Sequence, residues 1–339
     1  MRSGEFKVCL EQARRSAEIA VGLDNPAAAA LAHTLLGISL SLMGNLSEAE
    51  VELDAALEAG RGASAGRRIY FGFDHYSWVR VARITLLCLQ GHPTRSRAAI
   101  KEAFRDVQGM HHPVSFAIVI NSAATLLWIG DLDAAEEHLD WFISRAQSES
   151  FEPHLHVGHA FKGELAICRG EVEAGIALLQ SRLERLRLTR YGLFTMRLQA
   201  VLARGLAASG RCFEALALVD ATERLIEEKG YGCYMPELLR LKGSILLAMP
   251  AQHVEDAEKC FLKSLELSRA QGARGWELRA ATDLAAAWAA RGRAKEARTL
   301  LFPVFEKFSK EFATRDLEAA KSLLTKLGAR GGSGTSNKG

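Results

Sequence analysis

The sequence is poor in aromatic residues, proline and cysteine, and each shortage excludes a class of protein. Of 339 residues, 7% are aromatic, 7 are proline and 6 are cysteine. The cysteines form no CxxC pair, which argues against a zinc ribbon or a redox dithiol. No uninterrupted run of about 18 apolar residues occurs, so we expect no membrane span. The net charge of +3 is too small for a general polyanion binder.

Motifs of catalysis and secretion are also missing. The sequence contains no GxSxG, HExxH or GxGxxG, so it predicts no reaction, no cofactor and no metal site. Its first residues include Glu5, Glu11 and Glu18, unlike a secretory leader. Without a leader, six cysteines are best interpreted as reduced thiols, and we expect a cytoplasmic protein.

What the sequence does contain is a repeat. An apolar helix, a short turn that usually holds glycine, and a second helix recur seven times. The sixth turn lacks its glycine, and Gln252 takes the equivalent position. The intervals between these turn positions are then 47, 39, 40, 40, 42 and 40 residues. The turn glycines are Gly44, Gly91, Gly130, Gly170, Gly210 and Gly292.

Small residues at fixed places predict close helix packing. Five positions after each turn residue the second helix carries a small residue, and four further on a larger apolar one, so the pair shares a face. Seven positions before each turn glycine, the first helix is also small except at Ile84. In the sixth unit, whose turn is two residues longer, the small residue is Gly243, nine positions before Gln252. The second-helix pairs are Ala49 with Leu53, Ser96 with Ile100, Ala135 with Leu139, Gly175 with Leu179, Ala215 with Val219, Ala257 with Phe261, and Ala297 with Leu301.

This pattern resembles tetratricopeptide (TPR) repeats, with units near 40 rather than 34 residues. It predicts an all-α protein, a right-handed α-α superhelix of about seven helix pairs. We expect residues 29–327 to form the solenoid, with a capping helix from Leu317 to Leu327, and residues 328–339 to be a disordered tail. Residues 1–28 are expected to be the second helix of a preceding repeat. Either an upstream segment is missing or MRSGEF stands in its place.

A more specific resemblance lies in the segments YMPELLRLKGSILLA, DAEKCFLKSLELSRAQGARGWELRAATDLAAAWAARGRAKEARTLLFPVFEKF and EFATRDLEAAKSLLTKL. They resemble the C-terminal repeat region of bacterial regulators in which a winged-helix or adenylate/guanylate cyclase domain precedes a signal-transduction (STAND) ATPase. The resemblance covers about residues 5–327 and implies a sensor arm that binds protein. This sequence has no GxxxxGK[ST] loop, so the ATPase and its upstream domain would be partners rather than parts of this chain.

Arginines recur at steps of seven, which places them on one stripe of a helix: Arg190, Arg197, Arg204 and Arg211. The repeat register puts Arg197 and Arg204 on the concave face, with Glu237, Arg240, Ser244 and Arg279 on the same face of the next units. Such guanidinium groups suit carboxylate or phosphate groups, and this set is one candidate binding groove for an acidic peptide or anion. The alternative is an internally paired face, with Glu237 neutralising Arg240 or Arg279.

Two further clusters are weaker candidates. Aromatic residues crowd the segment after the first unit, where Tyr70, Phe73, Tyr76 and Trp78 either contact a partner or pack the longer connection onto the solenoid. Histidines cluster at His111-His112 and at His154, His156 and His159, but no acidic or cysteine ligand completes a zinc spacing.

Three functions remain open. The first is a non-catalytic module that binds protein, and an inducer in some cases, as the sensor arm of an ATPase or transcription regulator. The second is a free-standing scaffold or adaptor that binds an acidic extended peptide. The third is an enzyme with a site hidden in the groove. No contact with membrane or nucleic acid is expected from this region.

Overall fold

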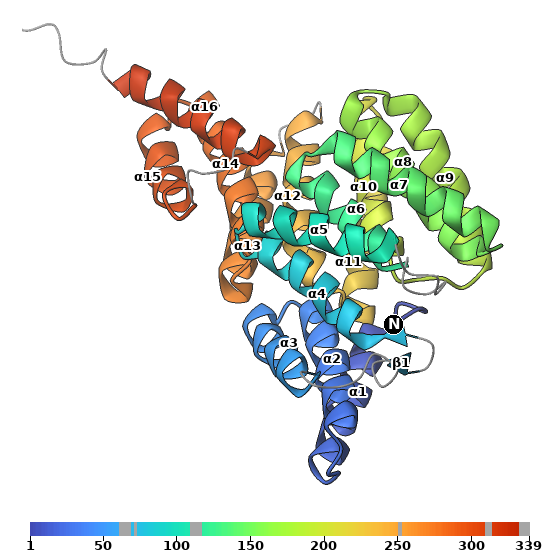
Figure 1. Ribbon diagram of the computed structural model, residues 1–339. Coiled ribbons are helices and arrows are strands. Elements are labelled where there is room, and N and C mark those ends of the chain that lie inside the picture. Colours follow the sequence, from blue (N-terminus) through green and yellow to red (C-terminus); the bar gives the residue numbers. More distant parts are fainter. Residues whose placement is uncertain (61–68, 71–72, 109–116, 250–252, 309–313, 332–339) are drawn as a thin grey trace, which may run out of the picture.

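The computed structural model describes residues 1–60, 69–70, 73–108, 117–249, 253–308 and 314–331. Within these residues the chain is almost entirely helical (Figure 1). Fourteen helices form seven consecutive pairs: α2 (Pro26–Met43) with α3 (Leu46–Gly60), α4 (His75–Leu89) with α5 (Pro93–Gln108), α6 (Ala117–Ile129) with α7 (Leu132–Ser148), α8 (Glu152–Arg169) with α9 (Val172–Leu188), α10 (Thr195–Ala208) with α11 (Cys212–Lys229), α12 (Met235–Ala248) with α13 (Val254–Gln271), and α14 (Arg274–Ala290) with α15 (Ala294–Phe305).

The six turns that the structure describes are built as the sequence predicts. All six turn glycines have positive φ, from 79° at Gly292 to 94° at Gly44, a conformation in which other residues are strained. The sixth turn, with Gln252, lies outside the described residues.

The packing inside each pair is also confirmed. Every small residue named for the second helices is buried, and so is the larger apolar residue four positions later. On the first helix, a Cβ added at Gly37 would lie 2.8 Å from Leu53, and one at Gly243 would lie 2.9 Å from Phe261. In the second unit, where Ile84 breaks the pattern, the Ser96 hydroxyl donates to the Ile84 carbonyl at 2.8 Å. The small or absent side chains at these positions therefore allow the two helices of a pair to approach closely.

Replacing Gly175 with alanine should destabilise the protein, although alanine normally favours helices. The new Cβ would lie 2.5 Å from Ile167 and 2.7 Å from the Gly163 carbonyl oxygen. Overpacking of this kind costs about 1–3 kcal/mol of unfolding free energy. Gly328→Ala in α16 is the control, because its nearest neighbour is 3.7 Å away, and it should gain up to about 1 kcal/mol. Equal urea midpoints for both variants would contradict this account of the helix seam.

Two additional helices flank the seven pairs. Helix α1 (Phe6–Val21) precedes them and packs against α2. Helix α16 (Arg315–Gly331) closes the other end, and the Thr314 hydroxyl accepts a hydrogen bond from the Leu317 amide at 3.2 Å. This helix begins two residues before the predicted start at Leu317 and continues to Gly331, past the boundary at 328 set for the tail. Residues 332–339 of the predicted tail lie outside the described residues.

A two-stranded antiparallel hairpin, β1 (Ile69–Tyr70) and β2 (Phe73–Asp74), lies before α4 in the otherwise helical chain. One expectation needs correction. Helix α2 is long and apolar enough to cross a membrane by length and composition alone, with 18 residues and a mean hydropathy of 1.5. The sequence shows no uninterrupted apolar run here, because the polar but uncharged residues Thr34, Ser39 and Ser41 divide it. All three are buried, as expected for a helix that packs among α1, α3 and α4.

The superhelix closes on itself, so that early units contact late ones. At Gly232, in the 3₁₀ helix η2 (Gly232–Tyr234), an added Cβ would lie 2.3 Å from the carbonyl oxygen of Met43 in α2. The Arg279 guanidinium on α14 donates to the Trp128 carbonyl on α6 at 2.8 Å. Helix α14 also contacts α4. The concave face is therefore an enclosed interior rather than an open channel.

Candidate functional site

A buried ion pair lies at the centre of this interior. The Arg197 guanidinium on α10 donates to both carboxylate oxygens of Glu164 on α8, at 3.0 and 3.2 Å, and to the Ala124 carbonyl at 3.0 Å. Both residues are about 2% exposed. The guanidinium carbon lies 4.3 Å from the Trp128 ring centroid and 4.9 Å from that of Phe161. The charge of Arg197 is thus neutralised by Glu164 within this chain, although its Nε has no hydrogen-bond partner among the described residues.

A second ion-pair network lies between α12, α14 and α16. Glu237 accepts two hydrogen bonds from Arg240, at 2.8 and 2.9 Å, and one from Arg279 at 3.2 Å. Arg240 also bonds Asp283 at 2.5 Å, and Arg279 bonds Asp316 at 2.6 Å. Burial alone would raise the pKa of Glu237, but the charges of Arg240 and Arg279 lower it to about 2. The network therefore stays ionised at physiological pH.

The structure brings together most of the predicted groove residues and shows that most are paired internally. Arg204, Glu237, Arg240 and Arg279 line a shared cavity, as the repeat register predicts. Ser244 donates to Asp283 at 3.2 Å, beside this cavity. The pairing of Glu237 with both Arg240 and Arg279 is the arrangement expected of the internally paired alternative. The seven-residue stripe itself is shorter than expected, because Arg190 and Arg211 lie outside α10.

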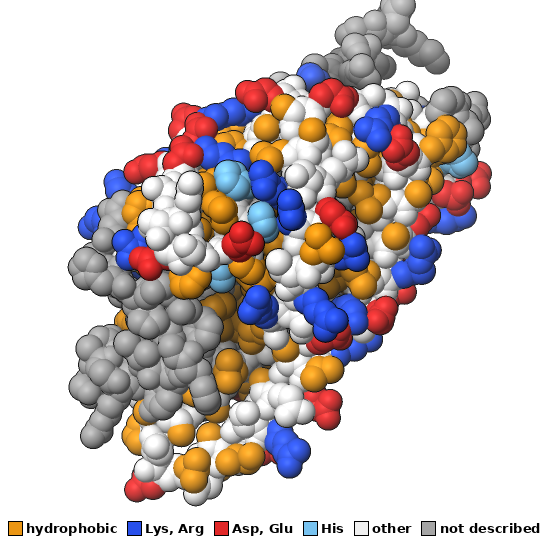
Figure 2. Space-filling model, turned by 90° about the vertical axis from the view of Figure 1, so that its right-hand side faces the viewer, with side chains coloured by type: hydrophobic (Ala, Val, Ile, Leu, Met, Phe, Trp, Pro, Cys, Tyr) orange, Lys and Arg blue, Asp and Glu red, His pale blue; other side chains and the backbone are white. Residues whose placement is uncertain are grey.

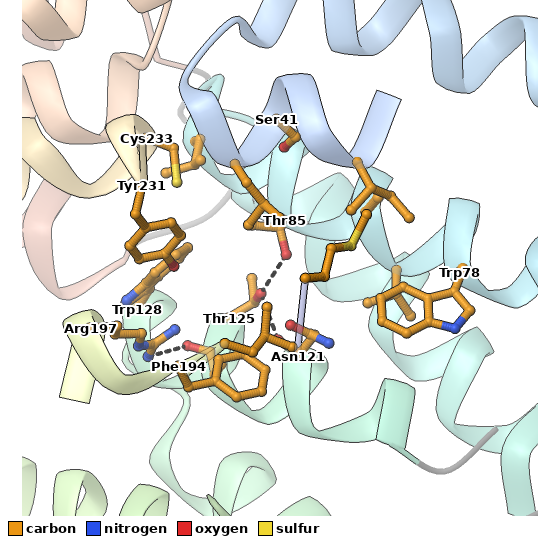
Figure 3. A pocket seen from close by; sticks show the side chains of 18 residues that line it. Ser41, Trp78, Thr85, Asn121, Thr125, Trp128, Phe194, Arg197, Tyr231 and Cys233 are labelled. Carbon is orange, nitrogen blue, oxygen red and sulfur yellow. Dashed lines mark hydrogen bonds between the residues drawn. The ribbon is translucent and has the colours of Figure 1, made fainter. Parts of the chain in front are cut away.

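An apolar cavity of about 80 Å³ adjoins the buried ion pair (Figure 3). Thr85 and Thr125 line it and point toward each other, and their hydroxyls are hydrogen-bonded at 3.4 Å. The Asn121 side chain faces the same space, and its amide has no hydrogen-bond partner among the described residues. The Met1 side chain also lines the cavity. This lining offers apolar surface and one amide that can both donate and accept.

The aromatic segment divides between two environments. Tyr70 and Phe73 lie in the hairpin, but their side chains are outside the described residues. Tyr76 is half-buried at the start of α4. Trp78 is half-buried and lines the apolar cavity, so it packs inward rather than standing out as an anchor.

Several residues of this interior were not predicted. Glu164, Trp128 and Asn121 belong to helices α8 and α6, for which the repeat pattern predicted only packing positions. A signal was available for Glu164, because an acidic residue on the inner face of a first helix must find a cation there. Arg315 on the capping helix lies outside the repeat register. It also lines the cavity that Arg204, Glu237, Arg240 and Arg279 share.

The described histidines do not form a metal site. No group of three histidine, cysteine or acidic side chains close enough to hold a metal occurs in the described part of the chain, which excludes His111 and His112. His154 packs near the rings of Phe151 and Tyr191, with centroids 5.8 and 5.7 Å away.

Figure 2 views the side on which α8–α10 lie, and acidic and basic side chains are intermingled there.

The environment of His154 predicts a loss of stability in mild acid. Burial, with a smaller contribution from the charge of Arg2, lowers its pKa below the ordinary 6.5. The unfolded chain then takes up a proton more readily, so unfolding free energy should fall as pH drops below about 6.5, by at most about 1.4 kcal/mol per pH unit for one histidine. His154→Phe should make this dependence less steep in urea titrations between about pH 7 and 5.5. A slope should remain, because burial lowers the pKa of His138 as well. An unchanged slope would contradict the assignment.

Comparison with known proteins supports the fold. No family model and no curated protein sequence matches the chain. Among solved structures, NprR in complex with its cognate peptide NprX superposes with a TM-score of 0.52 and 16% identity, over 88% of this chain and 84% of NprR. Yeast Tom70 aligns with a TM-score of 0.46 and 13% identity, over 98% of this chain and 60% of Tom70. The chain is a TPR-like, right-handed superhelical solenoid.

Proposed function

We propose that this chain is a non-catalytic module that binds a peptide or protein segment inside its superhelix. The observation that carries the proposal is the apolar cavity with the unpartnered Asn121 amide, which lies where an occupant would be enclosed by α2, α4, α6 and α10. A side-chain amide can donate to and accept from a peptide backbone at once. NprR, which has this fold, was solved with a cognate peptide, and this supports the same mode of binding here.

The contacts that close the superhelix supply a mechanism. Entry of a segment between the early and late units must separate contacts such as Arg279 with Trp128. A partner that binds the open form more tightly than the closed one then shifts the population toward the open form. Inverting a 1:99 population requires a differential affinity of about 5.5 kcal/mol.

The biological setting follows from the resemblance in the sequence. We place the module in the bacterial cytoplasm as the sensor arm of a STAND-type ATPase or transcription regulator, where a change in curvature would alter the attached switch. An acidic extended peptide is a less favoured occupant, because Arg197, Arg240 and Arg279 are already neutralised by carboxylates of this chain.

Selection from a displayed random-peptide library tests the binding function. Peptides selected on the intact chain should bind Asn121→Ala about tenfold more weakly, as expected for loss of the hydrogen bonds that its amide would make to the peptide. Gln147→Ala is the matched control, because it removes an exposed amide from α7, and it should bind as the unaltered chain does. Failure to select any peptide, or equal loss in both variants, would overturn the proposal. The regulatory role is tested separately, by measuring ATP hydrolysis of the ATPase encoded with this chain, with and without a selected peptide.

A further inference from the structure

A polar cavity of about 360 Å³ lies beneath the capping helix, between α16 and the inner helices α6, α8, α10, α12 and α14. Four arginines and three carboxylates line it: Arg204, Arg240, Arg279 and Arg315, with Glu237, Asp283 and Asp316. The lining therefore carries one excess positive charge. Its size falls in the range of cavities that hold small molecules.

Two of the four guanidinium groups form no ion pair with a carboxylate of the cavity. Arg240 and Arg279 take all three carboxylates of the cavity, as the network of Glu237 shows. Arg204 and Arg315 are left. The nearest carboxylate oxygen to Arg204 is that of Glu164, at 4.0 Å, and Glu164 is already bonded by Arg197.

Arg204 on α10 and Arg315 on α16 line the cavity together with the thiol of Cys168. The Arg204 guanidinium donates to the Cys168 sulfur at 3.4 Å. Arg315 begins α16, and no ion pair of its side chain is found among the described residues. Burial raises the pKa of the Cys168 thiol, and the charges of the two arginines oppose that shift. An anion beside Cys168 could therefore be held from two sides.

Most of the remaining lining is an apolar wall. It comprises Trp128, Leu132, Ile167, Leu127, Ala208 and Ala319, while Thr282 adds a polar side chain. A fully hydrated inorganic ion would leave this wall in contact with water. A carboxylate attached to a compact apolar body would cover it while its charge met the arginines.

We propose that this cavity binds a small organic monocarboxylate, with its carboxylate between Arg204 and Arg315 and its apolar body against Trp128, Leu132 and Ile167. This site is separate from the peptide site and does not depend on it. Because Arg315 belongs to α16 and Arg204 to α10, a bound carboxylate joins the capping helix to the fifth unit. The ligand would thereby stiffen the C-terminal end of the superhelix.

Calorimetric titration of the full chain with benzoate, benzamide and inorganic phosphate tests this assignment. Benzoate should bind at least tenfold more tightly than neutral benzamide and than phosphate. Arg204→Gln and Arg315→Gln should each weaken benzoate binding about tenfold or more, because each removes a charge-assisted hydrogen bond. Arg211→Gln, an exposed arginine paired with Glu214, is the control and should bind benzoate as the unaltered chain does.

A second measurement covers the case in which a variant does not fold. Alkylation of Cys168 in the unaltered chain, followed by mass spectrometry, should slow in benzoate and not in benzamide. Benzamide or phosphate binding as well as benzoate would overturn the proposal. So would benzoate affinity that is unchanged in both arginine variants, or an unprotected Cys168. Peptide binding can persist in all of these cases, so failure here is distinguishable from failure of the proposed function.

Discussion

Glu164→Ala is expected to lower the free energy of unfolding by about 3–5 kcal/mol, because it leaves the buried Arg197 charge without its carboxylate. Arg197 would retain the Ala124 carbonyl and the faces of Trp128 and Phe161, none of which carries a negative charge. Water cannot replace the carboxylate readily, since both partners are about 2% exposed. Chemical denaturation followed by circular dichroism measures the loss.

Two controls separate the buried charge from a general effect of substitution. Glu214→Ala removes an exposed partner of Arg211 and should cost less than about 1 kcal/mol. The double variant Glu164→Leu with Arg197→Met should recover much of the stability, because an apolar pair of similar size avoids the cost of desolvation. A double variant that is less stable than Glu164→Ala would show that the pair stabilises the fold beyond compensating its own burial.

Gly232→Ala is expected to open the superhelix. The added Cβ would lie 2.3 Å from the Met43 carbonyl oxygen. Because this oxygen belongs to the backbone, no side-chain rotation can relieve the clash. We expect a cost of about 1–3 kcal/mol, together with a larger radius of gyration in small-angle X-ray scattering. Amide exchange should rise at the C-terminal end of α2 and in η2.

Gly22→Ala is the control for this prediction. Gly22 follows α1, has φ of −81°, and its added Cβ would have its nearest neighbour at 3.6 Å. This variant should leave the scattering curve unchanged. An unaltered radius of gyration in Gly232→Ala would mean that α2 and η2 can separate without opening the rest of the superhelix.

The repeat units were predictable because their determinants are local. A glycine at each turn and a small residue five positions later act within one helix pair, so the register could be read from spacing alone. The pairing of Glu237 with Arg240 was foreseen for the same reason, since these residues are three positions apart on α12.

The closure and the cavities were not predictable in this way. The contact of Arg279 with the Trp128 carbonyl joins residues 151 positions apart, and it depends on the accumulated curvature of the intervening units. No spacing in the sequence encodes that curvature. The position of Arg315 in a cavity was not predicted, because this residue lies outside the repeats. The cavity it lines exists only when α16 packs over the inner helices.

The contact between early and late units also changes how the molecule should fold. In an open solenoid each repeat touches its neighbours alone, and folding can begin anywhere and spread along the chain. Here the end units share contacts of long sequence separation, so loss of either end exposes surface on the other. Unfolding should therefore approach a single cooperative transition, and refolding should be slower than for an open array of the same length, because distant segments must meet before their contacts stabilise the chain.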